Sequence, residues 1–263
     1  MDLGLKGKAV IVTGAASNIG RAIALEFAKE GSRIAIADLD EKGGQKVVDL
    51  AKELGAEGAI FIKTDVTKSE QCNEMAREVL DKFDIIDVLV NNAGWGKDAL
   101  FIEKPREEWE KEIDINLWGV INCIKAVVDH LVEKKGGSIV SIASDAGRMG
   151  EFREAVYAAA KAGVIGLTKS LARELGPYGI RMNVVCPGAT LPTSPDEIGE
   201  KSMWGDSMPA ITPEFVQKIA KRYPLRRIAR PDELAKAVVF LASEGAGFIT
   251  GQTLSVSGGY TMV

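Results

Sequence analysis

Short apolar runs recur along the chain and alternate with longer segments of helical periodicity. Seven runs are rich in Val, Ile and Ala, and they span residues 9–14, 33–38, 59–65, 87–94, 138–144, 181–188 and 253–259. Most are continuously apolar, as expected for strands buried on both faces of a parallel sheet. Helical patterns lie between them, at residues 20–29, 69–82, 107–133, 157–175 and 231–243. This alternation predicts an α/β fold: a doubly wound, mostly parallel, seven-stranded sheet with helices on both faces.

Residues 189–223 depart from this alternation. The segment follows the carboxyl end of a predicted strand and contains four prolines, and a loop this long is more often functional than idle. Its apolar residues Met203, Trp204, Met208 and Ile211 favour a lid that closes over an apolar ligand. A surface excursion without function is the alternative. We predict that residues 1–263 form one domain that includes this lid.

Composition narrows the classes of function. The 263 residues are 46% hydrophobic and 27% charged, with a net charge of -4, so neither nucleic acid nor an anionic membrane is an expected partner. No apolar run reaches the roughly 18 residues of a membrane helix. The three cysteines are far apart, which predicts no metal site and a reducing, cytoplasmic location. The single histidine, His130, lies near the end of the helix predicted over residues 107–133, which argues against a Ser-His-Asp hydrolase.

A candidate phosphate-binding turn follows the first strand. Residues 13–20 read TGAASNIG, in which Gly14 permits a tight turn and Gly20 permits close packing of the next helix. The amino terminus of that helix would offer free N–H groups to a pyrophosphate. Asn18 stands where a glycine is usual, and we expect it to adopt the left-handed conformation that asparagine tolerates.

The acid at the end of the second strand bears on the choice of cofactor. Asp38 follows Gly20 by 18 residues, at the place where a carboxylate accepts hydrogen bonds from an adenosine ribose. The same charge repels a 2′-phosphate, and neither Ser17 nor Leu39 supplies a cation. These residues favour NAD over NADP. A surface turn or helix cap is the alternative role of Asp38.

A second group of residues is suited to proton transfer. Tyr157 and Lys161 are four residues apart and therefore share one helix face. A lysine ammonium favours the phenolate form of a tyrosine, whose pKa is ordinarily about 10. Ser144 ends the preceding strand, where its hydroxyl could hold a substrate oxygen beside Tyr157. Alone, a Tyr-Lys pair at this spacing is usually only a pair of neighbours.

Six motifs that occur in a fixed order make a catalytic role for this pair the better interpretation. TGAASNIG, NNAG at residues 91–94, IDINLWG around Asn116, SIVSIAS ending at Ser144, YAAAK and CPG at residues 186–188 together resemble the short-chain dehydrogenase/reductase family, from about Leu5 to the carboxyl terminus. The resemblance implies a Rossmann fold and an enzyme that acts on CH–OH groups. It implies a catalytic set of Asn116, Ser144, Tyr157 and Lys161. It implies that Tyr157 is the general acid/base, that Ser144 orients the substrate, that Lys161 binds the nicotinamide ribose and lowers the pKa of Tyr157, and that Asn116 holds a water for proton relay. The implied cofactor site comprises Gly14, Ser17, Asn18, Ile19, Gly20, Asp38, Asp65, Val66, Asn92, Tyr157, Lys161, Pro187 and Thr190.

Further words narrow the resemblance within the family. NNAGW, IASDAGR, EAVYAA, NVVCPGAT and GFITGQTLSVSGGYTM are similar to members such as 2-hydroxycyclohexanecarboxyl-CoA dehydrogenase. The implied activity is NAD-dependent interconversion of a secondary alcohol and a ketone, on a hydroxyacyl-CoA or a cyclic hydroxy acid derivative. Trp95 and Trp204 could enclose an apolar ring, and Arg148 or Arg153 could meet a carboxylate or a CoA phosphate.

Other functions stay open at this point. Within the family, a 3-oxoacyl reductase or a polyol dehydrogenase is the alternative. From another class, the chain could be a cofactor-binding subunit without catalytic activity, although the intact catalytic set argues against this. The basic run at residues 221–227 is more typical of a solvated face than of a nucleic-acid site. The family resemblance implies a homodimer or homotetramer formed through the two long helices.

Overall fold

The computed structural model describes residues 2–194, 197–202 and 212–263. Seven parallel strands form one sheet in the order β3-β2-β1-β4-β5-β6-β7. The strands are β1 (Ala9–Thr13), β2 (Arg33–Asp38), β3 (Gly58–Lys63), β4 (Val88–Asn91), β5 (Gly137–Ile142), β6 (Ile180–Pro187) and β7 (Thr253–Val256). The predicted doubly wound α/β sheet is therefore confirmed, and all of its strand pairs are parallel.

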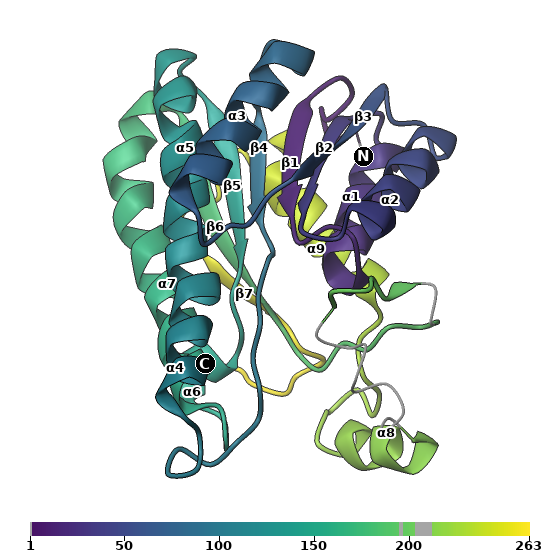
Figure 1. Ribbon diagram of the computed structural model, residues 1–263, viewed down its shortest axis with the longest axis vertical. Coiled ribbons are helices and arrows are strands. Elements are labelled where there is room, and N and C mark those ends of the chain that lie inside the picture. The colour runs from purple at the N-terminus through teal and green to yellow at the C-terminus, as the bar shows by residue number, and fades with distance from the viewer. Residues whose placement is uncertain (1, 195–196, 203–211) are drawn as a thin grey trace.

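Helices cover both faces of the sheet (Figure 1). The longer ones are α1 (Asn18–Lys29), α2 (Glu41–Glu53), α3 (Ser69–Phe83), α4 (Arg106–Ile113), α5 (Gly119–Glu133), α7 (Ala155–Leu175), α8 (Pro213–Ala220) and α9 (Pro231–Ala242). Short turns complete the order: the π turn η1 (Asp114–Trp118), α6 (Ala146–Met149), η2 (Gly176–Tyr178) and η5 (Glu244–Ala246). One buried cluster joins α3, α5 and α7 to the sheet, and a second joins α1, α2 and α9 to its other face.

Two elements differ from the expected pattern. The predicted helix over residues 107–133 is interrupted by the π turn, which inserts an extra residue and separates α4 from α5. Helix α2 was not among the predicted helices, because its glycines weaken the helical pattern. Gly44 is needed there, since a Cβ at that position would lie 2.2 Å from the Phe61 ring.

The order of the strands locates the ligand site. The chain runs outward from β1 through β2 to β3, then returns to pair β4 with the other side of β1. At such a reversal the loops after the two strands separate, and ligands bind beyond the carboxyl ends. Helix α8 also lies at this end of the molecule (Figure 1). The residues expected to form the lid are only partly described, and the single-domain organisation stays a prediction.

Candidate active site

The turn after β1 is held by the end of β4. The buried Thr13 hydroxyl accepts hydrogen bonds from the backbone N–H groups of Asn92 (3.0 Å) and Ala93 (3.1 Å). The Asn92 side chain donates in turn to the carbonyls of Thr13 and Gly14, at 3.0 Å each. The hydrogen bonds of Asn92 are therefore made within the protein, where they fix the shape of the turn that would face a ligand.

The backbone of this turn forms a cradle. Gly14 has φ +63° and Asn18 has φ +43°, so the predicted left-handed conformation of Asn18 is confirmed. A Cβ on Gly20 would lie 2.1 Å from the Gly14 carbonyl oxygen, which shows how closely α1 approaches the turn. Ser17 is extended and directly precedes α1, and Ile19 lies in its first turn. This arrangement fits a pyrophosphate at the helix amino terminus.

Asn18 carries a second indication of a ligand. Its side chain is 7% exposed, and its Oδ1 atom has no hydrogen-bond partner in the described part of the chain. Buried polar atoms are normally paired, so an unpaired acceptor on the cradle fits a ligand that donates a hydrogen bond. The residues of the cradle thus fit a dinucleotide.

The adenosine side of the cradle is acidic. Asp38 ends β2, and its two carboxylate oxygens accept the N–H groups of Ala16 and Asp40, at 2.9 Å each. Burial raises the pKa of Asp38. The buried Asp40 caps α2 by accepting from Gly43 N–H. Two carboxyl groups therefore lie on this side of the cradle.

Asp65 and Val66 occupy the positions that the resemblance assigns to the adenine. The Asp65 carboxylate accepts from both the N–H (3.0 Å) and the hydroxyl (2.7 Å) of Thr67, so it shapes its own turn. Val66 is buried, and its carbonyl accepts a hydrogen bond from the Asn122 side chain at 3.0 Å. Val66 thus presents an apolar surface that is anchored from α5.

Tyr157, Lys161 and Ser144 come together at the start of α7. The ammonium of Lys161 lies 5.6 Å from the centre of the Tyr157 ring and donates to the Ile142 carbonyl at 2.9 Å. Ser144 follows β5, accepts Ala146 N–H at 3.1 Å, and lies close enough to the Tyr157 hydroxyl to influence its pKa. The structure thus unites three of the four residues implied by the resemblance.

Burial dominates the titration of these groups. It raises the pKa of Tyr157, so the expectation that Lys161 lowers this pKa is not met; the neighbouring Ser144 hydroxyl lowers the pKa less than burial raises it. Burial lowers the pKa of Lys161 to about 8. Tyr157 is therefore a neutral phenol near pH 7, which is the form that donates a proton. Glu154, three residues before Tyr157, has its pKa raised to about 7 by burial and by the neighbouring carboxylates of Asp98 and Glu151.

The fourth residue, Asn116, lies in the π turn. It is fully buried, and its amide donates to the carbonyls of Trp95 (2.6 Å) and Glu112 (2.8 Å). Its Oδ1 atom accepts the N–H of Trp95 at 3.2 Å. Asn116 also lies near Lys161, since a Cβ on Gly94 would be 3.0 Å from Asn116 Oδ1 and 3.4 Å from Lys161 Nζ. Asn116 thus holds the loop after β4 and lies near Lys161.

The residues expected at the nicotinamide end follow β6. Pro187 ends the strand, and the buried Thr190 donates from its hydroxyl to the Gly188 carbonyl at 3.0 Å. Burial raises the pKa of the neighbouring Cys186 to about 12, so its thiol stays neutral. These residues form a neutral surface beside Tyr157 and Lys161.

The residues expected to bind substrate differ in their surroundings, and several of them contact other protein groups. The Lys111 ammonium covers the Trp95 ring at 4.0 Å from its centre, and Arg148 lies 3.6 Å from the Asp145 carboxylate. Arg153 is exposed, has φ +72°, and donates to the Asp98 carbonyl at 3.3 Å. Trp204 lies outside the described residues, as do Met203, Met208 and Ile211. Both arginines are thus engaged within the protein.

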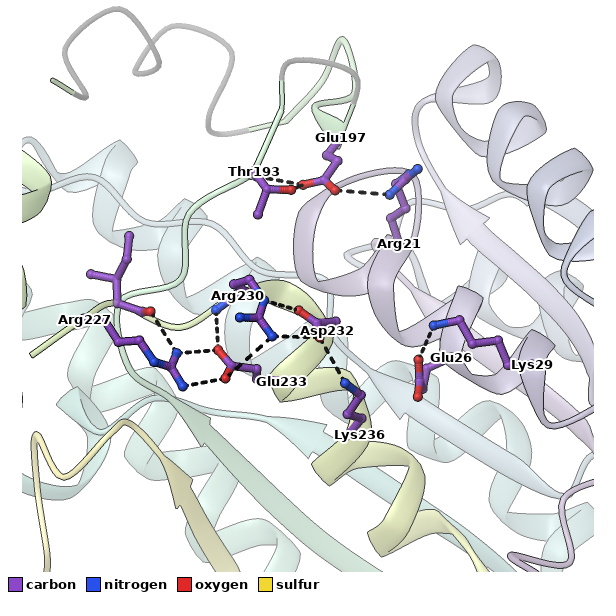
Figure 2. Close-up of polar contacts among 11 residues, drawn as sticks. Arg21, Glu26, Lys29, Thr193, Glu197, Arg227, Arg230, Asp232, Glu233 and Lys236 are labelled. Atoms are coloured by element: carbon purple, nitrogen blue, oxygen red, sulfur yellow. Dashed lines mark hydrogen bonds and ion pairs between the residues drawn. The ribbon is translucent and has the colours of Figure 1, made fainter. Parts of the chain in front are cut away.

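The segment after β6 contacts the dinucleotide cradle. Glu197 lies 3.6 Å from Arg21 of α1 and accepts the N–H and hydroxyl of Thr193 (Figure 2). Glu200 donates its N–H to Asp40 at 2.7 Å. The first part of the expected lid therefore lies against α1 and the start of α2.

The basic run at residues 221–227 is largely paired within the protein. Arg227 forms an ion pair with Glu233 at the start of α9 (Figure 2). Arg222 contacts Glu151 and the Tyr260 hydroxyl, and Arg226 donates to the Lys221 carbonyl. The ion pairs of Arg222 and Arg227 reduce the positive charge that a CoA phosphate would meet, whereas Arg226 keeps its charge.

Some site residues were not among those expected from the sequence. Thr13, Asp40 and Glu112 accept hydrogen bonds from backbone N–H groups elsewhere in the chain, Lys104 forms a buried ion pair with Glu112, and burial raises the pKa of Glu154. Only Asp40 has a local sequence signal, because an acid directly before a helix is a common N-cap.

Comparison with known proteins agrees with this geometry. A model of the family described as enoyl-(acyl carrier protein) reductase matches residues 14–261. The 3-oxoacyl-[acyl-carrier-protein] reductase FabG of Staphylococcus epidermidis is 40% identical over 256 residues, which are 97% of this chain and 99% of that relative. The FabG of Thermotoga maritima is 36% identical over 255 residues, or 97% and 98% of the two chains. The chain belongs to the short-chain dehydrogenase/reductase family.

A solved structure supports the same assignment. A 7α-hydroxysteroid dehydrogenase complexed with NADH and 7-oxo glycochenodeoxycholic acid superposes with a TM-score of 0.88 at 32% identity, over 98% of this chain and 96% of that one. The predicted family, fold and enzyme class are thereby confirmed: the chain is an oxidoreductase acting on CH–OH or keto groups.

One helical stretch meets the size of a membrane span. Among the described residues, Arg106–Glu133 is long and apolar enough by length and composition alone. This is weak evidence, because the core helix of a soluble protein passes the same test, and α5 packs Val120, Ile124 and Val127 into the core. The cytoplasmic location stays a prediction.

Proposed function

We propose that the protein reduces a ketone to a secondary alcohol, reversibly, with Tyr157 as the proton donor. The observation that carries this proposal is the placement of Ser144 and the buried Lys161 beside Tyr157. The cradle after β1 would hold a nicotinamide dinucleotide, which when bound would supply the hydride for the carbonyl carbon. Ser144 and Tyr157 hold the carbonyl oxygen, and Tyr157 transfers its phenolic proton to that oxygen. Lys161 orients Tyr157, and Asn116 orients the loop after β4 that packs on the Tyr157 ring.

Replacement of Tyr157 tests this chemistry. Tyr157→Phe keeps the ring but removes the proton, so kcat should fall roughly 10²- to 10⁴-fold, the range of general acid-base catalysis. The dissociation constant of NADH, measured by fluorescence titration, should stay within about twofold, since little binding energy is removed. Retained turnover in Tyr157→Phe would refute the assigned chemistry. Retained cofactor binding without any turnover in the wild type would instead favour a subunit without catalytic activity.

We infer that the cofactor is NAD(H). Asp38 and Asp40 place two carboxyl groups at the ribose side of the cradle, where they disfavour a 2′-phosphate. Two cations on the helices beside the cradle are paired, Arg21 with Glu197 at 3.6 Å and Lys42 with Glu200 at 2.8 Å. The NADH complex of the 7α-hydroxysteroid dehydrogenase is consistent with this choice.

The preference can be measured directly. We expect a higher kcat/KM with NADH than with NADPH, and Asp38→Ser should narrow the difference because it removes the repelling charge. Faster turnover with NADPH at equal low concentrations would overturn the inference. Ser17→Ala is a matched control, since it alters the same edge of the cradle without changing its charge.

We infer that the substrate is a 3-oxoacyl thioester. The names of the relatives support this class, because both FabG proteins are described as 3-oxoacyl-[acyl-carrier-protein] reductases. The protonated Tyr157 also suits the reducing direction. A cyclic hydroxy acid linked to CoA is the second candidate, supported by the sequence motifs around Trp95 and Arg148.

A substrate panel distinguishes these candidates. Acetoacetyl-CoA, a 2-oxocyclohexanecarboxyl thioester, a 7-oxo bile acid and a free polyol would be compared by kcat/KM under the same conditions. The 3-oxoacyl inference predicts the highest value for acetoacetyl-CoA. Activity confined to the polyol or the bile acid would refute a thioester substrate, and preference for the cyclic thioester would select the second candidate.

We propose a homo-oligomer for the working enzyme. Large apolar side chains are exposed at Trp118, Phe248 and Leu254, and Phe248 is fully exposed. Light scattering after gel filtration should give a mass of two or four times 28.2 kDa. A monomer at micromolar concentration would overturn this proposal.

A further inference from the structure

Lys104 and Glu112 form a buried ion pair beside the active site. The exposed fraction is 2% for the Lys104 side chain and 0% for that of Glu112. Lys104 lies before α4 and Glu112 lies in its last turn, four residues before Asn116. Buried ion pairs often add little to stability compared with apolar residues of similar volume. The function of this ion pair is therefore better inferred from its position in the fold than from its contribution to stability.

Glu112 is connected to the loop after β4. The carboxylate oxygen that contacts Lys104 also accepts the backbone N–H of Lys97 at 3.2 Å. Asn116, which hydrogen-bonds the Glu112 carbonyl, also holds Trp95 through both its N–H and its carbonyl. Residues 95–97 are therefore held from α4 and the π turn on both sides of Gly96.

Gly96 is the point at which this loop meets Tyr157. A Cβ at Gly96 would lie 3.0 Å from Tyr157 Cδ2 and 3.4 Å from Tyr157 Cε2, so the loop backbone packs directly on the ring. A displacement of residues 95–97 would remove the surface on which the ring rests. Such displacements matter because a misplacement of about 1 Å can lower a rate roughly 100-fold.

We propose that Glu112, held by Lys104, is a positioning residue for Tyr157. It acts through the hydrogen bond from Lys97 N–H, which keeps the backbone at Gly96 against the ring. Lys104 holds the carboxylate oxygen in place, turned toward the loop. This inference rests on the proposed role of Tyr157 as the proton donor.

Two double variants differ only in the acceptor for Lys97 N–H. Lys104→Met with Glu112→Gln removes both charges but keeps a side-chain oxygen, whereas Lys104→Met with Glu112→Leu removes the oxygen as well. We expect the Gln variant to keep kcat within about threefold and the Leu variant to lose roughly tenfold or more. The KM for the dinucleotide should change less than twofold in both, because the loop does not form the phosphate cradle.

A second ion pair provides the control. Lys134 and Asp87 are 2.7 Å apart, and Asp87 accepts Ala9 N–H at the start of β1, at the opposite end of the sheet. Lys134→Met with Asp87→Leu should lower the midpoint of thermal unfolding and leave kcat unchanged. Equal losses of kcat in the Gln and Leu variants, or a Leu variant within twofold of the wild type, would overturn the proposal.

Gly96→Ala tests the same contact should the Leu variant fail to fold. The added methyl group would press on the Tyr157 ring, so kcat should fall at least tenfold while NADH binding is kept. Unchanged kcat in Gly96→Ala would overturn the proposal. Turnover that survives Tyr157→Phe would instead refute the proposed function on which it rests, so the two failures are distinguishable.

Discussion

Substitution of Gly20 by alanine should damage the dinucleotide cradle. The new Cβ would lie 2.1 Å from the Gly14 carbonyl oxygen and 2.4 Å from the Asn92 amide nitrogen. The oxygen belongs to the backbone, so α1 or the turn must move by more than an ångström to reach ordinary contact distances. Overpacking of this kind costs about 1–3 kcal/mol, which corresponds to a 5- to 150-fold weaker affinity if it falls on binding.

The assay needs two measurements on the same protein. Fluorescence titration gives the dissociation constant of NADH, and urea unfolding gives the free energy of unfolding, so that damage to the cradle and damage to the fold are separated. Gly166→Ala is the matched control. Gly166 lies within α7 with nothing within 4 Å of a new Cβ, so the same substitution should stabilise the protein by about 0.5–1 kcal/mol.

The test is decisive because the two substitutions should change the free energy of unfolding in opposite directions. If Gly20→Ala binds NADH as tightly as the wild type and unfolds at the same urea concentration, the close approach of α1 to the turn is not a requirement of the site. If Gly166→Ala weakens NADH binding as much as Gly20→Ala, the effect is not specific to the cradle.

Three further predictions concern single residues. Asn18→Ala should lower the free energy of unfolding by about 1–2 kcal/mol relative to Asn18→Gly in urea melts, because residue 18 has φ +43°. Arg181 donates to four carbonyls at and beyond the end of α9, so Arg181→Lys should cost about 2 kcal/mol in the same measurement, and a cost near zero would contradict this. The pKa of Glu154 is raised from 4.5 to about 7, so its contribution to stability is full below pH 4.5 and is lost as the pH rises to about 7. The stability of Glu154→Gln relative to the wild type should therefore increase between pH 4.5 and 7, and a constant difference would contradict the shifted pKa.

The strands and the main chemical groups were predictable because their signals are local. Apolar runs mark the seven strands, and the spacing of Tyr157 and Lys161 places both on one helix face whatever surrounds them. Asn18 was predictable as a left-handed residue, since its side-chain chemistry tolerates that conformation in any context.

The remaining features depend on contacts between distant parts of the chain. The π turn at Asp114–Trp118 adds one residue to a continuing helical pattern, which the apolar periodicity does not reveal. The burial of Glu112 was not predictable, because a charged residue in a helix normally faces solvent. Residue patterns therefore predicted the strands and the candidate site groups, while tertiary contacts decide how those groups are held.

The hydrogen bonds between Thr13 and Asn92 have a consequence for the order of folding. The two residues are 79 positions apart, yet their hydrogen bonds give the turn after β1 its shape. A fragment that ends before β4 contains every residue of the TGAASNIG motif but lacks the partner that shapes it. During synthesis, the turn can capture a dinucleotide only after β4 has emerged and paired with β1. The ligand then stabilises that pairing by mass action, so a bound dinucleotide signals that the centre of the sheet is complete.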